Sequence, residues 1–293
     1  MTKTILLTGA TGFLGSHICE KLVEQGYETV ILKRKTSNAW RIEPILDRII
    51  VYNIGEGSLK KIFRENEIKT IIHTATSYGK MGEKSHELAT TNVIFPLKIL
   101  ETAIDFNVDT FINTDTVLYE YFNHYSLTKK HFLDWAKTFS SQIGIFNLKL
   151  EHLYGEKDGP EKFISMVIRN FLKNVDRIPL TEGKQLRDFI YVDDAVSAYL
   201  EILKISNTHR NGYVEYSIGS GAPISIREIV ELIKKLTHNT TTVPNFGVLE
   251  YRPNEIMKSV ADLKNIENDT QWKPKYDLKS GLEKTIQWHK KHI

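Results

Sequence analysis

A tyrosine and a lysine near the middle of the chain have the residue types and the spacing of a proton-transfer pair. Tyr125 and Lys129 stand four positions apart in "YSLTKK", so on a helix they lie on one face. An ammonium beside a phenol favours phenolate, and we expect it to lower the pKa of the tyrosine from about 10. A hydroxyl from the upstream segment "TFINTDT", Thr114 or Thr116, can hold the same substrate oxygen. This chemistry is general acid–base catalysis at an oxygen of a bound molecule.

Such a pair also occurs by chance in many helices, so it gains meaning only beside a cofactor site. "TGATGFLG" follows the apolar run "TILLT" and places Gly9, Gly12 and Gly15 three residues apart. Glycines there permit a tight turn, close approach of backbone N–H groups to a pyrophosphate, and close packing of helix on strand. The strand-and-helix context favours a dinucleotide site over a merely tight turn. Its predicted contacts also include Thr11, Phe13 and Leu14.

The end of the second predicted strand bears on the choice between NAD and NADP. NAD sites usually present a carboxylate to the ribose 2′-hydroxyl, whereas NADP sites offer arginine to the 2′-phosphate. Here "ILKRKTSN" carries Lys33, Arg34 and Lys35 without an acid. Arginine can bind a phosphate through two hydrogen bonds, so the segment favours NADPH, with NAD less favoured. A solvated strand edge is the alternative interpretation.

The elements that position these residues follow from an alternation of short apolar runs and amphipathic stretches through the first half of the chain. This alternation predicts an α/β fold, a Rossmann-like doubly wound parallel sheet with helices on both faces. Beyond Gly155 the alternation fades, and a smaller C-terminal α/β lobe that binds substrate is expected. We predict a dinucleotide-binding domain over 1–151, joined by about 189–219, and a substrate-binding lobe over 152–188 and 220–293.

Composition excludes several other classes of protein. Of 293 residues, 41% are hydrophobic and 26% charged, the balance of a soluble globular protein. The net charge of +3 is spread without a basic block, so no nucleic-acid partner is expected. No window approaches the roughly 18 apolar residues of a membrane span, and we expect a cytoplasmic protein without membrane attachment. The single Cys19 gives no internal disulfide and no metal-site spacing.

Along nearly its whole length the chain resembles the extended short-chain dehydrogenase/reductases, the NAD-dependent epimerase/dehydratase family, which act mostly on nucleotide sugars. The resemblance rests on "TGATGFLG", "IIHTAT", "NVIFPLKILETA", "YSLTKK", "LRDFIYVDDAVSAYL" and "WKPKYDLKSGLEKTIQW". It implies a catalytic set of Thr116, Tyr125 and Lys129. Counting five residues from Phe111 selects Thr116, whereas counting from Tyr119 selects Asp115. The choice between Thr114 and Thr116 therefore stays open.

Within this family the segments "FINTDT", "YSLTKKHFLDW", "LEHLYG" and "GKQLRDFIYVDD" look most like the CDP-paratose and CDP-abequose synthases. Those are NADPH-dependent 4-ketoreductases of CDP-4-keto-3,6-dideoxyglucose, which supply dideoxyhexoses for surface polysaccharides such as O-antigens. The resemblance implies a CDP-linked substrate and a homodimer formed through the helices flanking the tyrosine. Dehydratases of the family have Asp and Glu after the threonine, and Val117 and Leu118 cannot do that proton work.

The resemblance also implies further contacts. Arg187 and Arg252 resemble arginines that pair with a nucleotide pyrophosphate, and His152 stands where many relatives have asparagine. The implied substrate contacts are Tyr78, His152, Arg187 and Arg252. The implied cofactor contacts beyond those above are Asn53, Ile54, Thr74, Ala75, Thr76 and Asn92. His73 is either a cofactor neighbour or a buried core residue.

Two other functions remain open from the sequence. One is a 4-epimerase that oxidises and re-reduces the same carbon with a retained NAD. The other is a non-catalytic NADP-binding sensor, because the fold alone does not imply activity.

Overall fold

The computed structural model describes residues 4–55, 57, 59–206 and 211–293, and the chain divides into two compact units. Unit 1 comprises Met1–Lys149 and Tyr199–Tyr216, and unit 2 comprises Leu150–Ala198 and Ser217–Ile293. From the sequence, 189–219 was expected to join the dinucleotide-binding domain. The structure groups 189–198 and 217–219 with unit 2, where strand β10 (Phe189–Tyr191) pairs with β7 (His152–Tyr154).

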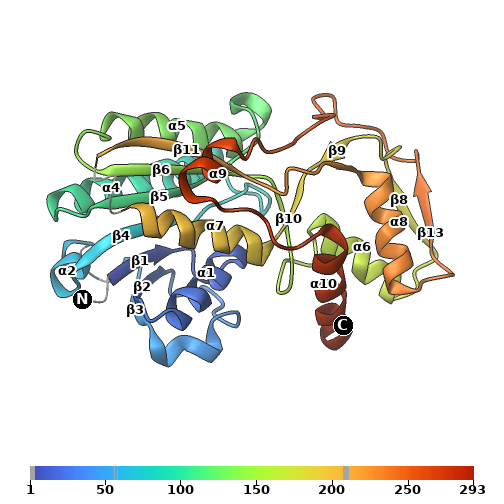
Figure 1. Ribbon diagram of the computed structural model, residues 1–293, viewed down its shortest axis with the longest axis horizontal. Helices are drawn as coiled ribbons and strands as arrows, with labels where there is room; N and C mark the ends of the chain where they lie inside the picture. Colours follow the sequence, from blue (N-terminus) through green and yellow to red (C-terminus); the bar gives the residue numbers. More distant parts are fainter. Residues whose placement is uncertain (1–3, 56, 58, 207–210) are drawn as a thin grey trace. The chain divides into compact units, whose positions relative to one another are not determined.

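Unit 1 is built on a seven-stranded sheet in the order β11-β6-β5-β4-β1-β2-β3 (Figure 1). Strand β1 pairs in parallel with β2 and β4, β2 with β3, and β4 with β5. The strands are β1 (Thr4–Thr8), β2 (Glu28–Lys33), β3 (Ile50–Asn53), β4 (Ile68–His73), β5 (Thr110–Thr116), β6 (Gly144–Leu150) and β11 (Gly212–Ile218). The helices are α1 (Phe13–Glu24), η1 (Glu43–Arg48), α2 (Leu59–Glu65), α3 (Ser85–Ala89), η2 (Thr90–Ile94), α4 (Phe95–Asp105), η3 (Glu120–Phe122) and α5 (His124–Thr138).

Apolar side chains on alternate strand residues cover both faces of this sheet. Leu6 and Phe111 belong to a core shared with α2, α4 and α5, which contribute residues such as Phe63, Leu100 and Phe132. The intervening strand residues, Ile5 and Leu7 among them, are also fully buried, and strand geometry directs them to the opposite face. A sheet buried on both faces needs nearly continuous apolar strands, as these are. The predicted Rossmann-like fold is confirmed.

Chain order reverses between β1 and β4, which lie side by side in the sheet. In open parallel sheets, ligands bind outside the carboxyl ends of the strands at such a switch point. A ligand site is therefore expected at the carboxyl ends of the strands of unit 1.

Unit 2 consists of short strand pairs and helices. Its sheets pair β10 with β7, β12 with β9, and β13 with β8. The remaining elements are α6 (Phe163–Leu172), β8 (Arg177–Leu180), β9 (Leu186–Arg187), α7 (Val192–Ile205, whose last residues belong to unit 1), β12 (Ile224–Ser225), α8 (Ile226–Thr237), β13 (Val243–Phe246), α9 (Lys264–Thr270) and α10 (Leu278–His292). Helix α8 starts in a capping box between Ser225 and Glu228, as the sequence "SIRE" favours.

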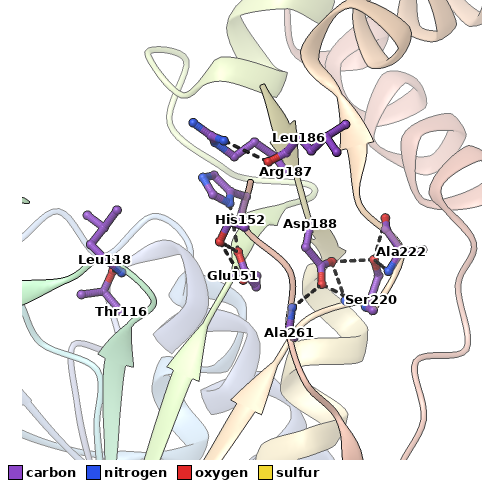
Figure 2. Close-up of polar contacts among 12 residues, drawn as sticks. Thr116, Leu118, Glu151, His152, Leu186, Arg187, Asp188, Ser220, Ala222 and Ala261 are labelled. Atoms are coloured by element: carbon purple, nitrogen blue, oxygen red, sulfur yellow. Dashed lines mark hydrogen bonds and ion pairs between the residues drawn. The ribbon is translucent and has the colours of Figure 1, made fainter. Parts of the chain in front are cut away.

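A buried carboxylate joins two loops of unit 2 to the start of β10. Asp188 is fully buried, and its side chain accepts hydrogen bonds from the backbone N–H groups of Ser220 (2.7 Å), Gly221 (3.0 Å) and Ala261 (3.1 Å) (Figure 2). The Ser220 hydroxyl donates to the same carboxylate. Because Asp188 directly precedes β10, these bonds tie the start of that strand to the loop at Ser220 and Gly221 and to the loop at Ala261.

The free energy of unfolding is expected to fall below pH 6.5 because of the buried His289 of α10. This residue is 1% exposed, and its ring nitrogens have no hydrogen-bond partner among the described residues. Burial, with Arg169 and His292 adding positive charge, lowers the pKa of His289 to about 4 from 6.5. Between these values the unfolded chain binds a proton that the folded chain excludes, so stability is lost as pH falls through this window. In urea unfolding, His289 alone should lower the free energy of unfolding by about 2 kcal/mol at pH 5 relative to pH 7.5.

The His289→Leu variant should lose this contribution and keep the one from the buried His73, whose pKa is also lowered, whereas the exposed His86→Leu variant should retain both. An unchanged pH dependence of the unfolding free energy in His289→Leu would show that His289 does not contribute to it.

Candidate active site

The glycine loop lies between β1 and the amino terminus of α1. Gly9 has a φ of 76°, and the Gly12 N–H donates to the Gly9 carbonyl at 2.9 Å. A Cβ on Gly15 would lie 2.1 Å from that carbonyl oxygen. Gly12 begins the helix without a side-chain cap, so no side chain competes for the first N–H groups. The loop therefore fits a pyrophosphate, which an uncapped helix amino terminus favours. Thr11 lies in this loop, and Phe13 and Leu14 are the first two residues of α1.

The residues predicted to contact the far end of the cofactor meet at the ends of β2 and β3. Lys33 and Asn53 are register partners, and the Ile54 N–H donates to the Lys33 carbonyl at 2.8 Å. Arg34 is exposed directly after β2, and its charge contributes to lowering the pKa of Glu83, after hydrogen bonds from Ser77 and the backbone. Both cations thus lie at the strand end that the dinucleotide rule assigns to the ribose.

The segment after β4 is bonded to the end of β1. The Thr74 hydroxyl donates to the Thr8 carbonyl at 2.8 Å, and the Ala75 N–H donates to the Thr8 hydroxyl at 3.4 Å. His73 is fully buried among Phe95, Phe111 and Phe132, with Nδ1 2.7 Å from the Thr8 hydroxyl. Burial lowers the pKa of His73 well below its usual value, aided by Lys129. His73 is thus a core residue.

Asn92 braces the loop that follows. It lies in the π-helical turn η2 and is 1% exposed. Its amide oxygen accepts from the Ser77 N–H at 2.8 Å and the Thr76 hydroxyl at 3.1 Å. Its amide nitrogen donates to the Ser77 carbonyl and, at 3.0 Å, to the Thr128 hydroxyl of α5. Asn92 therefore joins the loop after β4 to the helix that carries Tyr125.

Tyr125 and Lys129 lie in the first two turns of α5. Asn123 caps this helix by accepting from the Ser126 N–H at 2.8 Å, which fixes where the first turn begins. Lys129 is 2% exposed, and burial lowers its pKa to about 8, partly offset by Asp115. The ammonium is thus charged at neutral pH and titrates just above it.

The pKa of Tyr125 is raised, opposite to the sequence-based expectation. Burial is the main cause, with Tyr78 and Asp115 adding to it, while a hydrogen bond with the Thr116 side chain acts in the other direction. The ring of Tyr78 packs on that of Tyr125, with centroids 4.9 Å apart. Desolvation penalises the charged form, so the Tyr125 phenol is protonated at neutral pH.

The two candidate threonines have different partners. Thr116 is the last residue of β5, its hydroxyl accepts from the Leu118 N–H at 3.3 Å, and its side chain faces Tyr125 and acts to lower the pKa of that phenol. The Thr114 hydroxyl lies 2.7 Å from the hydroxyl of the buried Tyr199. Of the two, Thr116 is therefore the one whose side chain faces Tyr125.

Sequence reasoning missed a buried ion pair beside Thr116. Lys130 Nζ lies 2.8 Å from Asp115 Oδ2 and donates to the Thr116 carbonyl at 2.9 Å. Asn147 of β6 also donates to Asp115 Oδ2, at 3.1 Å. The only sequence signal was an acid on an otherwise buried strand and a second lysine after Lys129.

The remaining predicted substrate residues lie together in unit 2. Nδ1 of His152 is 3.3 Å from Oε2 of Glu151, which accepts the Ser259 hydroxyl at 2.8 Å (Figure 2). Arg187 is buried, donates to the Leu186 carbonyl at 2.9 Å and pairs with Glu255. Burial lowers the pKa of Arg187; Glu255 and Glu151 oppose this, and Arg252 adds to it. Two arginines and a histidine thus share one charged cluster.

Metal sites and membrane spans are both missing from the described ranges. No group of three or more His, Cys, Asp or Glu side chains in these ranges could hold a metal ion. Among the helices of the same ranges, none combines the length and apolar character needed to cross a membrane.

The comparisons with known proteins agree with this architecture. A CDP-abequose synthase from Salmonella muenchen is 33% identical over 296 residues, which cover 98% of each chain. The UDP-glucose 4-epimerase of Thermotoga maritima, solved with UDP-glucose, superposes with a TM-score of 0.85 at 23% identity over 99% of both chains. A UDP-glucuronic acid 4-epimerase from Bacillus cereus, solved with UDP-glucuronic acid and NAD, gives 0.84 at 24% identity, covering 99% of this chain and 100% of that one. The model of the NAD dependent epimerase/dehydratase family matches residues 5–219, and the chain belongs to that family.

Proposed function

We propose that the protein uses NADPH to reduce the 4-keto group of a CDP-linked deoxysugar of the CDP-4-keto-3,6-dideoxyglucose type, giving a CDP-3,6-dideoxyhexose such as paratose or abequose. One observation carries the proposal: Tyr125 faces the Thr116 side chain at the end of β5 and lies one helical turn from the buried Lys129. The apolar Val117 and Leu118 follow Thr116, which argues against dehydration. The name of the Salmonella relative, CDP-abequose synthase, supports a CDP-sugar substrate.

In this mechanism the catalytic and binding tasks are divided among five residues. NADPH, when bound, supplies the two electrons and the hydrogen that carbon gains. Thr116 holds the ketone oxygen by a hydrogen bond, and Tyr125 donates its phenolic proton to that oxygen. Lys129, charged below about pH 8, binds the ribose hydroxyls of the cofactor and stabilises the phenolate that remains. Arg187 and Arg252 bind the pyrophosphate of the sugar nucleotide.

A 4-epimerase is the second candidate, because the structural relatives named above are epimerases, one of them with NAD. Epimerisation starts with oxidation, for which Tyr125 must accept a proton, whereas its raised pKa favours the donor form. Purified protein, NADPH and a panel of nucleotide 4-keto-6-deoxysugars should give net loss of NADPH absorbance with at least one substrate. Tightly retained NAD without net consumption would favour the epimerase, and NADP binding without turnover would favour a non-catalytic sensor.

Arg34→Asp is expected to reverse the preference for NADPH. The change replaces a phosphate-binding fork with a carboxylate that repels the 2′-phosphate and suits a ribose hydroxyl. Steady-state kinetics should show KM for NADPH rising about 100-fold while KM for NADH falls. Lys69→Asp, an equal charge change at an exposed position of β4, is the control and should alter neither KM. An unchanged preference in Arg34→Asp would mean that the cations are only a solvated strand edge.

We also propose a homodimer formed through α5 and its neighbour α4. Trp135 is 54% exposed and lines a shallow pocket with His131, Asp134 and Thr138 on the outer side of α5. An aromatic residue so exposed is typical of an interface. Light scattering should give about twice the chain mass of 33.8 kDa, and Trp135→Glu should give the monomer. Met81→Glu, at a more exposed apolar residue, should leave the mass unchanged; a wild-type monomer would contradict the proposal.

A further inference from the structure

We propose that the Asp115–Lys130 ion pair is a positioning device that holds Thr116 in place for the ketone, a role that rests on the reaction proposed above. Both polar backbone groups of Thr116 are bonded to this pair. Its N–H donates to Asp115 Oδ1 at 2.7 Å, and its carbonyl accepts from Lys130 Nζ at 2.9 Å. Because Thr116 is the last residue of β5, these bonds fix its backbone where the strand ends, and hence the direction of its hydroxyl.

The pair is itself anchored to the sheet. The side chain of Asp115 is fully buried and that of Lys130 is 20% exposed. Asn147 of β6 donates to Asp115 Oδ2 at 3.1 Å and to Glu215 Oε2 of β11 at 2.9 Å. Asn113 of β5 donates to Asn147 Oδ1 at 2.7 Å. The position of Asp115 is thereby set by three neighbouring strands, and that of Lys130 by α5.

Stability alone is a weak reason for such a pair. Desolvating two charges offsets most of their attraction, and well-packed apolar residues often replace a buried pair with equal or greater stability. An apolar pair, however, cannot bond both the N–H and the carbonyl of Thr116. A displacement of about 1 Å at a reacting group can cost about 100-fold in rate. We therefore assign to the ion pair the role of fixing the position of Thr116.

The two charges also act in opposite directions on the pKa of Lys129. The groups facing Tyr125 are Tyr78 from the loop after β4, Asp115 and Thr116 from β5, and Tyr199 from α7. Those facing Lys129 are Asp115, Lys130 and His73 of β4. Asp115 raises the pKa of Lys129, whereas Lys130 lowers it. Removal of one charge should therefore move the alkaline limb of the pH profile in one direction, and removal of the other should move it in the opposite direction.

The test compares Asp115→Asn, Lys130→Met, Lys130→Arg and the Asp115→Asn/Lys130→Met double variant, with kcat and KM measured from pH 6 to 10. Asp115→Asn and Lys130→Met should each lower kcat about 10- to 100-fold, with KM for NADPH within about twofold of wild type. The alkaline limb of the pH profile, expected at about pH 8 in the wild type from the pKa of Lys129, should move to lower pH in Asp115→Asn and to higher pH in Lys130→Met. Lys130→Arg should recover most of kcat because it keeps both donors. The double variant should stay slow although it buries no unpaired charge, and it keeps the test available where a single variant fails to fold.

The positioning role would be overturned if the double variant kept the wild-type kcat. It would also be overturned if the losses of kcat followed the losses of melting temperature and the alkaline limb did not move in opposite directions in the two single variants. A readout without turnover separates this outcome from failure of the proposed function. With methyl-labelled threonine and the Thr116 signal assigned from a Thr116→Val variant, NMR should show that signal displaced in Asp115→Asn and Lys130→Met and restored in Lys130→Arg. An unmoved signal would overturn the proposal even if no substrate in the panel reacts.

Discussion

Replacing Tyr125 by phenylalanine is expected to lower kcat about 1,000-fold while the affinity for NADPH stays within about twofold of wild type. The variant keeps the ring that packs on Tyr78 and loses only the hydroxyl, which faces Thr116. Loss of the proton donor leaves the ketone oxygen without a proton as charge develops on it. Single-turnover measurement of NADPH oxidation, with binding followed separately by cofactor fluorescence, distinguishes the chemical step from cofactor affinity.

Tyr121→Phe is the matched control, because Tyr121 is 75% exposed, lies in η3 just before the same helix and loses the same single oxygen. It should retain wild-type kcat. Equal kcat in Tyr125→Phe and wild type would exclude Tyr125 as the proton donor and leave the family assignment standing.

Gly9→Ala is expected to destabilise unit 1 by about 3 kcal/mol and to weaken NADPH binding at least about 100-fold. The φ of 76° is a left-handed conformation that L side chains rarely adopt. A methyl group would also lie 2.6 Å from the backbone nitrogen of Ala75 and from the Thr74 hydroxyl. Backbone cannot move aside as a flexible side chain can, so the segment after β4 must shift. Urea unfolding and fluorescence titration with NADPH measure the two effects.

Gly26→Ala separates strain from crowding. Gly26 has nearly the same φ, 80°, but nothing lies within 4 Å of the point that a Cβ there would occupy. This variant should cost about 1 kcal/mol of stability and leave NADPH affinity unchanged. Equal effects of the two substitutions on NADPH affinity would show that crowding at the glycine loop does not matter for cofactor binding.

Much of unit 1 could be predicted because local pattern and tertiary structure agree there. The run "TILLT" is buried on both faces as β1, and the glycines follow it at the amino terminus of α1. The end of β4 could be recognised in the sequence because its apolar run stops there. This placed Thr74, Ala75 and Thr76 directly after the strand. Asn92 was predicted only as a cofactor contact. Its hydrogen bonds to Ser77 and Thr128 could not be predicted, because no sequence pattern indicates them.

What could not be predicted depends on long-range packing. The pKa of Tyr125 was expected to fall because Lys129 is four residues away, but burial by distant segments dominates and raises it. The Asp115–Lys130 pair joins a strand to a helix 15 residues later, and its Asn147 anchor comes from a further strand. Residue spacing does not reveal burial of this kind. The boundary near 189 also depended on pairing, since β10 joins β7 rather than the large sheet.

Transfer of deuterium from labelled NADPH tests the central claim most directly. The protein is incubated with CDP-4-keto-3,6-dideoxyglucose and NADPH carrying deuterium at the transferring carbon of the nicotinamide, and the product is examined by NMR. The proposed reduction predicts one deuterium at C4 of a CDP-3,6-dideoxyhexose and one NADPH oxidised per product. Product without deuterium at C4, or interconversion of C4 epimers without net oxidation of NADPH, would contradict it.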